Sequence, residues 1–201
     1  LLLFAMSGKE LTKQIERRIG QCVLTCPTTA VYAGIAEGEA VALGKNLRFF
    51  GDGWQTSKML RVGEQNHPQR FWRIPVMDGE FLTEETTGMV RAVGGGNFLV
   101  LATSQPQALA ACEAAIEAMK KIPNVIMPFP GGVVRSGSKV GSKYKSMFAS
   151  TNDAFCPTLK GVTNTELSSE IESVMEIVID GLTFEDIALS MKVGIEAICA
   201  L

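Results

Sequence analysis

The chain has 201 residues, of which 46% are hydrophobic and 20% are charged, and its formal net charge is −2. These values describe a globular chain with room for one large domain or two small ones. The slightly acidic balance argues against a nucleic-acid partner, and the scattered Lys and Arg residues argue against a membrane-binding patch. No apolar run approaches the ~20 residues that are needed to span a bilayer.

Three segments repeat one pattern: an apolar strand, a hydroxyl residue, an acid or amide three places later, and then a helix. Each hydroxyl residue is a candidate N-cap of its helix, and each helix carries apolar residues at helical spacing. The strands are residues 1–6, 97–103 and 176–182, and the caps are Ser7, Ser104 and Thr183. The first strand is expected to be cut from a longer protein.

A strand is predicted after each of the first two helices, at residues 45–51 and 124–127. Strand–helix–strand units of this kind fold as split βαβ, ferredoxin-like layers, so we predict the α+β class with two such lobes. Residues 1–68 are predicted to be the C-terminal half of a first, incomplete lobe, and residues 69–201 a second lobe without its final strand. The strings FWRIPV and GEFLTEE indicate an extra hairpin after this boundary.

Five cysteines occur along the chain without a Cys-x-x-Cys pair, and there is one histidine, His67. These residues supply too few ligands at suitable spacing for zinc, so no metal site is predicted. Reduced thiols are typical of the cytoplasm, which is the expected location. His67 precedes Pro68 in a polar stretch and is expected to be exposed and inert, which leaves no Ser-His-Asp arrangement.

Glu176 stands at the head of an apolar strand. It lies seven residues before the cap Thr183, and Asn97 lies seven residues before the cap Ser104, so the two hold equivalent positions in the repeat. We expect their two strands to be central, parallel neighbours in the sheet. Glu176 and Asn97 should then lie close together beside Gly95 and Gly96. A carboxyl in such a strand can serve as a general acid, whereas a solvated sheet edge is the simpler interpretation. The glycines either let backbone N–H groups approach a ligand or form a turn.

Residues 128–158 form a long stretch rich in glycine, hydroxyl, amide and basic residues, and long irregular segments in compact domains are usually functional. Its GSKVGSK string lacks the spacing and the Gly-Lys-Ser/Thr ending of a P-loop. The cations suit an anionic ligand and the polar groups a heterocycle, although a solvated surface loop is the simpler interpretation. The predicted binding residues are Asn97, Gly95, Gly96, Arg135, Ser138, Lys139, Ser142, Lys143, Asn152 and Asp153.

Several strings resemble, in the same order, those of the formylmethanofuran:tetrahydromethanopterin formyltransferase family. They are RIGQCVLTCPT, RFFGDGW, WRIPVMDGEF, GGGNF, FPGGVV, SKVGSKY, STNDAFCPT and MEIVIDGL. The resemblance covers nearly all of the chain, and family members are longer at both ends. It implies two ferredoxin-like lobes, the proximal one first and the distal one second. It also implies a homo-oligomer, a dimer or a tetramer, or a subunit of the bacterial formyltransferase/hydrolase complex.

The resemblance further implies an acyltransferase that moves a formyl group between formylmethanofuran and tetrahydromethanopterin through a tetrahedral intermediate. The setting would be the one-carbon metabolism of methanogenesis or methylotrophy, with both compounds as substrates and no tightly bound cofactor. By local match, the family's proton-transferring glutamate falls on Glu176, and the anionic substrates suit Arg135, Lys139 and Lys143. The alternative function is a non-catalytic scaffold subunit, and an oxidoreductase is disfavoured because no phosphate-binding fingerprint occurs.

Overall fold

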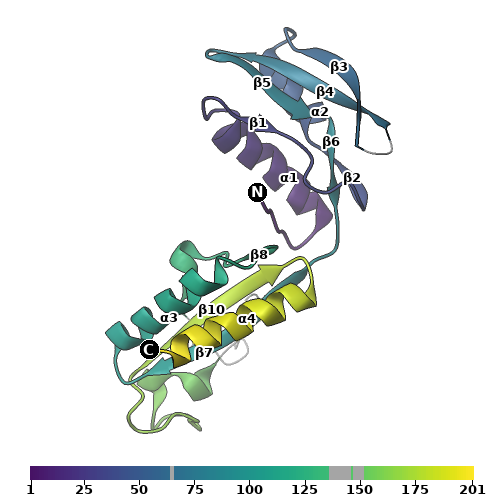
Figure 1. Cartoon of the computed structure of the whole chain (residues 1–201). Helices are drawn as coiled ribbons and strands as arrows, with labels where there is room; N and C mark the ends of the chain where they lie inside the picture. The colour runs from purple at the N-terminus through teal and green to yellow at the C-terminus, as the bar shows by residue number, and fades with distance from the viewer. Residues whose placement is uncertain (64–65, 136–145, 147–151) are drawn as a thin grey trace. The chain divides into compact units, whose positions relative to one another are not determined.

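The computed structural model describes residues 1–63, 66–135, 146 and 152–201, and it confirms the predicted α+β class. The chain forms two compact units, Leu1–Arg91 and Ala92–Leu201 (Figure 1). The sequence analysis placed the boundary between residues 68 and 69, which is a position inside strand β4 (His67–Val76). In the structure the two units are divided between Arg91 and Ala92. Because β4 pairs with strands on both of its edges, the whole hairpin region belongs to the first unit.

In the first unit, helix α1 (Gly8–Arg18) continues as a π-helical turn over Ile19–Val23. The oxygen of Ser7 accepts a hydrogen bond from the Glu10 backbone N–H at 3.3 Å, which confirms the predicted N-cap. Ile15 and Ile19 are buried in the core of this unit, as their helical spacing predicts.

The main sheet of the first unit has the order β1-β5-β4-β3. β4 pairs antiparallel with β3 and β5, and β1 pairs parallel with β5, while β2 and β6 form a separate pair. The bounds are β1 Ala30–Val31, β2 Glu39–Ala42, β3 Thr56–Val62, β5 Gly79–Glu84 and β6 Thr86–Met89. The predicted hairpin of FWRIPV and GEFLTEE is therefore confirmed as β4 and β5.

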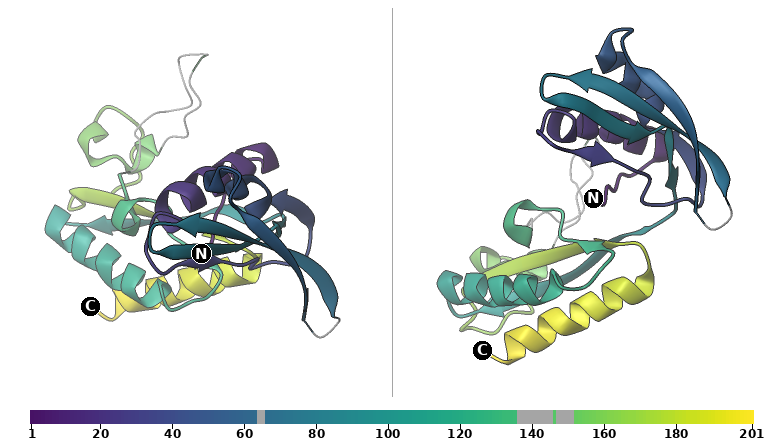
Figure 2. Two further views of the ribbon diagram at one scale, coloured as in Figure 1. Left: turned by 90° about the horizontal axis from the view of Figure 1, so that it is seen from above. Right: turned by 45° about the horizontal axis from the view of Figure 1, so that its top comes forward.

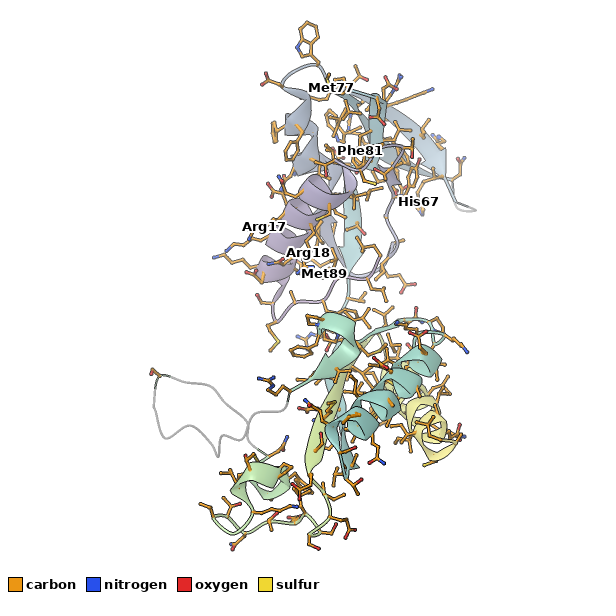
Figure 3. The ribbon with its side chains drawn as sticks, turned by 90° about the vertical axis from the view of Figure 1, so that its left-hand side faces the viewer. Arg17, Arg18, His67, Met77, Phe81 and Met89 are labelled. Atoms are coloured by element: carbon orange, nitrogen blue, oxygen red, sulfur yellow. The ribbon has the colours of Figure 1, made fainter. Side chains whose placement is uncertain are left out.

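Labelled side chains show the two sides of this hairpin region (Figure 3). Phe81 points into the core and is 2% exposed, whereas Met77, at the turn between β4 and β5, is fully exposed. His67 is exposed, as predicted, but it begins β4 and does not lie in a linker.

Two strands predicted in the first unit are absent. Residues 1–5 have no regular structure, and residues 45–51 lie in helix α2 (Gly44–Leu47) and the 3₁₀ turn Arg48–Gly51. At Gly44 the backbone passes close to the end of β5, since a Cβ built on Gly44 would lie 2.5 Å from the Glu84 carbonyl oxygen. The backbone N–H groups of Leu43 and Lys45 both donate to the Glu85 carbonyl, so the chain turns here.

The second unit is a layer of strands with two long helices. Its strands are β7 (Val93–Ala102), β8 (Val125–Ile126), β9 (Val133–Val134) and β10 (Ser173–Gly181). Its helices are α3 (Gln105–Met119) and α4 (Phe184–Cys199), and short 3₁₀ turns span Pro130–Gly132, Asp153–Phe155 and Pro157–Leu159. The order β7-β10-β8 is that of a split βαβ layer, in which the third strand lies between the first and second.

The predicted parallel direction of the two central strands is wrong, because β10 runs antiparallel to β7. It is also antiparallel to β8 and β9 on its other edge. In a split βαβ layer the crossover helix makes the first and second strands run the same way. The strand between them arrives by chain reversal and must run opposite to both.

Helices α3 and α4 lie side by side and pack on one face of this sheet (Figure 2). The core between them and the sheet includes Val100, Ile177 and Ile179. A Cβ on Gly194 of α4 would lie 2.6 Å from the sulfur of Met119 on α3, so the two helices pack closely at this point. Among the described residues, no helix is long and apolar enough to cross a membrane.

The two predicted helix caps in this unit, Thr183 and Ser104, differ from each other in their hydrogen bonds. Thr183 accepts a hydrogen bond from the Asp186 backbone N–H at 3.1 Å, as predicted. Ser104 occupies the N-cap position of α3, but its hydroxyl hydrogen-bonds to the Gln107 side chain and not to a backbone N–H.

The reactivity of the cysteines can test how tightly the core of the second unit is packed. Cys112 on α3 is fully buried, and burial together with the neighbouring Glu113 charge raises the pKa of its thiol to about 11. Cys22, Cys26 and Cys199 are exposed. Because the thiolate is the reactive form, we expect iodoacetamide at neutral pH to label the exposed cysteines and to spare Cys112 until the chain is unfolded in urea.

Peptide mass spectrometry of native and unfolded protein checks this expectation. Labelling of Cys112 in the native protein at the rate of Cys199 would contradict the close packing of α3 against the sheet.

Candidate active site

The candidate site lies on the face of the second unit's sheet that is opposite the helices. Side chains alternate between the two faces along a strand, and in β10 Ile177 and Ile179 are fully buried against the helices. Glu176, Val178 and Asp180 therefore share the other face, where they are half-buried. We call this the open face.

Glu176 and Asn97 are in direct contact on the open face. The Asn97 side-chain Nδ2 donates a hydrogen bond to Glu176 Oε1 at 2.6 Å. In register Asn97 opposes Val178, so it meets Glu176 diagonally, a distance that long side chains can span. The predicted proximity of the two residues is confirmed, although their strands run antiparallel.

Glu176 stands in the middle of the sheet. It opposes Leu99 of β7 on one side and Val134 of β9 on the other. The interpretation of Glu176 as a sheet-edge residue is therefore wrong. In register, Glu176 therefore stands between two apolar residues and accepts one hydrogen bond from an amide.

Residues Gly94 to Gly96 form a β-bulge in β7, and not a turn. Ile179 opposes Gly96 while Asp180 opposes Gly94, so Gly95 is an extra residue in the ladder. Gly95 has a φ of 103°, which side-chain-bearing residues rarely adopt. A Cβ on Gly96 would lie 2.4 Å from Ile187 of α4, so both positions need glycine.

Asp180 is the residue of this site that the sequence analysis missed. Its carboxylate lies beside the bulge, since a Cβ built on Gly94 would lie 3.5 Å from Asp180 Oδ1, and the nearby Gly95 backbone N–H favours its charged form. Partial burial nevertheless raises the pKa of Asp180 above its ordinary value, since this outweighs the lowering by the Gly95 N–H. The spacing of Glu176 and Asp180, four residues apart in one strand, was the available signal, because it places both acids on one face.

The remaining predicted binding residues are only partly described. Arg135 is exposed and directly follows Val134, the β9 residue that opposes Glu176. Asn152 and Asp153 are half-buried at the start of a 3₁₀ turn, where the Asn152 carbonyl accepts a hydrogen bond from the Phe155 N–H. The predicted binding residues Ser138, Lys139, Ser142 and Lys143 lie outside the described residues.

The part of the chain that the structure describes contains no group of three or more His, Cys, Asp or Glu side chains placed to hold a metal ion.

Comparison with known proteins places the chain in a family of formyltransferases. The family model described as "Formylmethanofuran-tetrahydromethanopterin formyltransferase" matches residues 1–76, and the model described as "FTR, proximal lobe" matches residues 79–201. The chain belongs to the formylmethanofuran–tetrahydromethanopterin formyltransferase family. The proximal label falls on the segment after residue 78, whereas the sequence analysis had given it to the first lobe.

The relatives are similar over the whole chain. The formylmethanofuran–tetrahydromethanopterin formyltransferase of Methylococcus capsulatus is 75% identical over 200 residues, which are 100% of this chain and 65% of that protein. The solved formyltransferase from Methanosarcina barkeri is 41% identical, with a TM-score of 0.85 over 98% of this chain and 65% of that one.

A second solved structure is the formyltransferase/hydrolase complex (FhcABCD) from Methylorubrum extorquens with methylofuran. One of its chains is 49% identical to this one, with a TM-score of 0.87 over 96% of this chain and 62% of that chain. The chain thus spans less than two thirds of the length of each of these relatives.

The ionisation of Asp180 should appear in the pH dependence of stability. A carboxyl whose pKa is raised on folding binds its proton more tightly in the folded state. The free energy of unfolding therefore falls as the pH rises from the ordinary value of 3.8 through the raised one, and stays lower above it. Asp180→Asn cannot ionise, so its free energy of unfolding should gain on that of the wild type across this interval.

Urea unfolding of both proteins from acid to neutral pH measures this difference. The matched control is Glu170→Gln, which removes an exposed carboxylate of the same unit and should run parallel to the wild type. A difference for Asp180→Asn that stays constant or shrinks with rising pH would contradict the burial of this carboxyl.

Proposed function

We propose that the protein is a formyltransferase that moves a formyl group between the amine of formylmethanofuran and a ring nitrogen of tetrahydromethanopterin. These substrates are the ones named for the Methylococcus capsulatus relative, which is 75% identical to this chain. The observation that carries the proposal is the contact of Glu176 with Asn97 on the open face. This contact holds the Glu176 carboxyl group in a fixed position, and the reaction needs an acid that transfers protons between two nitrogen atoms.

The reaction needs no redox change. The acceptor nitrogen attacks the formyl carbon, and a new C–N bond forms while the C=O π bond becomes an oxyanion. The attacking nitrogen then gives up a proton, the donor nitrogen takes one, and the original C–N bond breaks as the C=O bond re-forms. An acid that can both give and take a proton serves both ends of this sequence.

Glu176 is proposed to be that acid. Asn97 donates to Oε1, so this oxygen is held as an acceptor and the proton is carried on Oε2. Leu99 and Val134 oppose Glu176 in the two neighbouring strands, which fixes its place in the sheet. An acid that is already in place can act without rearrangement of the site.

We propose that the two anionic substrates bind to basic and polar residues that come after β9 in the sequence. Arg135 stands one residue beyond Val134 and is exposed, which suits a carboxylate or phosphate group of a substrate. Lys139 and Lys143, with Ser138, Ser142, Asn152, Asp153, Gly95 and Gly96, remain proposed binding residues.

The proposed setting is the cytoplasm, which the five free cysteines support. A related chain occurs in the FhcABCD complex, and this supports association with other subunits. We also propose a homo-oligomer, which the family resemblance implies.

The test is formyl transfer between the two substrates by the full-length protein and its Glu176→Gln variant. The amide keeps the size of Glu176 and an acceptor for Asn97, but it cannot deliver a proton. We expect kcat to fall by about two or more orders of magnitude with an unchanged thermal unfolding curve.

Glu172→Gln is the matched control, because this carboxylate lies directly before β10 and pairs with Lys160. It should retain activity near that of the wild type. Wild-type-like turnover by Glu176→Gln would remove Glu176 from the reaction. An inactive wild type, assayed also with the other subunits of the complex, would favour a scaffold.

A further inference from the structure

Lys160 lies in a stretch of the second unit that has little regular structure. Residues 152–172 lead into β10 (Figure 1), and their only regular elements are the two short 3₁₀ turns Asp153–Phe155 and Pro157–Leu159. Leu167 is the single buried residue of this stretch, all of which the structure describes. Because so little apolar surface is buried here, the conformation depends mainly on hydrogen bonds.

The Lys160 ammonium group binds three acceptors at the far end of this stretch. Its Nζ donates to the Ser169 carbonyl at 2.9 Å and to the Ile171 carbonyl, and it pairs with Glu172 Oε1 at 3.4 Å. An ammonium group has three N–H donors, so these contacts use its full donor capacity. The Lys160 side chain is 23% exposed and that of Glu172 is 67% exposed, so the two carbonyls are the main acceptors.

The 3₁₀ turn at residues 153–155 is bound to the part of the stretch that Lys160 closes. The Ala154 carbonyl accepts hydrogen bonds from the Glu166 N–H at 2.9 Å and from the Thr165 hydroxyl at 3.1 Å. Both donors lie in sequence between Lys160 and its acceptors. The contacts of the ammonium group therefore also limit where this turn can lie.

The acceptors of Lys160 are in turn attached to the sheet. The Glu172 N–H donates to the carbonyl of Ala102, the last residue of β7, at 3.0 Å, and β10 begins at the next residue. A continuous path of hydrogen bonds thus leads from the sheet through Lys160 to the turn that follows Asn152 and contains Asp153.

We propose that Lys160 is a positioning residue: its ammonium group fastens residues 152–172 to the start of β10 and thereby fixes Asn152 and Asp153 for substrate binding. The inference deepens the proposed formyl transfer, and its effect on turnover rests on that function and on the proposed role of these two residues. Its effect on the turn is independent of any activity. Lys160 differs from Arg135, which is exposed and is proposed to bind a substrate anion.

The first arm of the test follows hydrogen–deuterium exchange by NMR in the full-length protein. The N–H groups of Phe155 and Cys156 donate to the carbonyls of Asn152 and Asp153, so they report on the turn. Lys160→Met keeps the length of the side chain and removes the ammonium group. We expect exchange of both amides to speed up by about tenfold or more, the scale of a lost hydrogen bond to a charged group.

Lys192→Met is the matched control, because it removes an ammonium group of the same unit that is 70% exposed on α4. It should leave the exchange of Phe155 and Cys156 unchanged. Unchanged exchange of these two amides in folded Lys160→Met would overturn the proposal, and so would an equal acceleration in Lys192→Met.

The wild-type protein offers a measurement that needs no variant. An acetylating reagent attacks free amines, and the Lys160 ammonium group must give up its hydrogen bonds before it can react. Lys160 should therefore be acetylated about tenfold more slowly than Lys192, as quantified by peptide mass spectrometry. Equal rates at the two lysines would overturn the proposal.

The second arm measures formyl transfer. Lys160→Met should raise KM for at least one of the two substrates by about tenfold with kcat little changed, because it loosens binding residues and leaves Glu176 in place. In a protein that already carries Asn152→Ala and Asp153→Ala, Lys160→Met should raise KM little further, since its route through these residues is cut.

A fall in kcat at unchanged KM, or independent increases in KM that simply multiply in the cycle, would overturn the positioning role. An unchanged KM in the variant with Asn152→Ala and Asp153→Ala would overturn it as well. If the full-length wild-type protein transfers no formyl group, the proposed function fails, and the exchange arm then still decides whether Lys160 fixes the turn.

Discussion

The open face depends on the pairing of β10 with neighbours along both of its edges. With β7 on one side and β8 and β9 on the other, the strand cannot slide, since a shift of one residue would turn Ile177 and Ile179 out of the core. The same alternation that buries these two side chains presents Glu176 and Asp180 on the opposite face. The apolar core and the acid groups are thus two consequences of one register.

The bulge reconciles this rigid register with a polar site. A regular β7 would carry its ladder past Asp180 and leave its carboxylate beside a paired backbone. Gly95 is the extra residue of the ladder and stands next to Gly94, which opposes Asp180. Helix α4 limits how far the bulge can move, since Ile187 lies against Gly96. A core contact at Gly96 and an extra residue at Gly95 are therefore adjacent in β7.

Much of this arrangement follows from local patterns in the sequence. The caps at Ser7 and Thr183 and the helical stripes depend on short-range spacing, and the structure shows them. The proximity of Glu176 and Asn97, which are 79 residues apart, followed from their equivalent positions in two repeats, and the structure shows it as well. The helix at residues 44–47 was not predictable in this way, because it depends on a close approach of Gly44 to Glu84, forty residues away in sequence. The direction of β10 depends on the order of strands in the sheet, which no single segment contains.

The two acids of the open face stand in different environments. Partial burial raises the pKa of Asp180 above its ordinary value. Glu176 accepts a hydrogen bond from the Asn97 side chain at one oxygen, Oε1, and stands in register between Leu99 and Val134. In the proposed reaction its second oxygen is the one that exchanges a proton with a bound amine. Because environment separates the roles of paired carboxyl groups, the proposed chemistry depends on the register of β10 as much as on the acid itself.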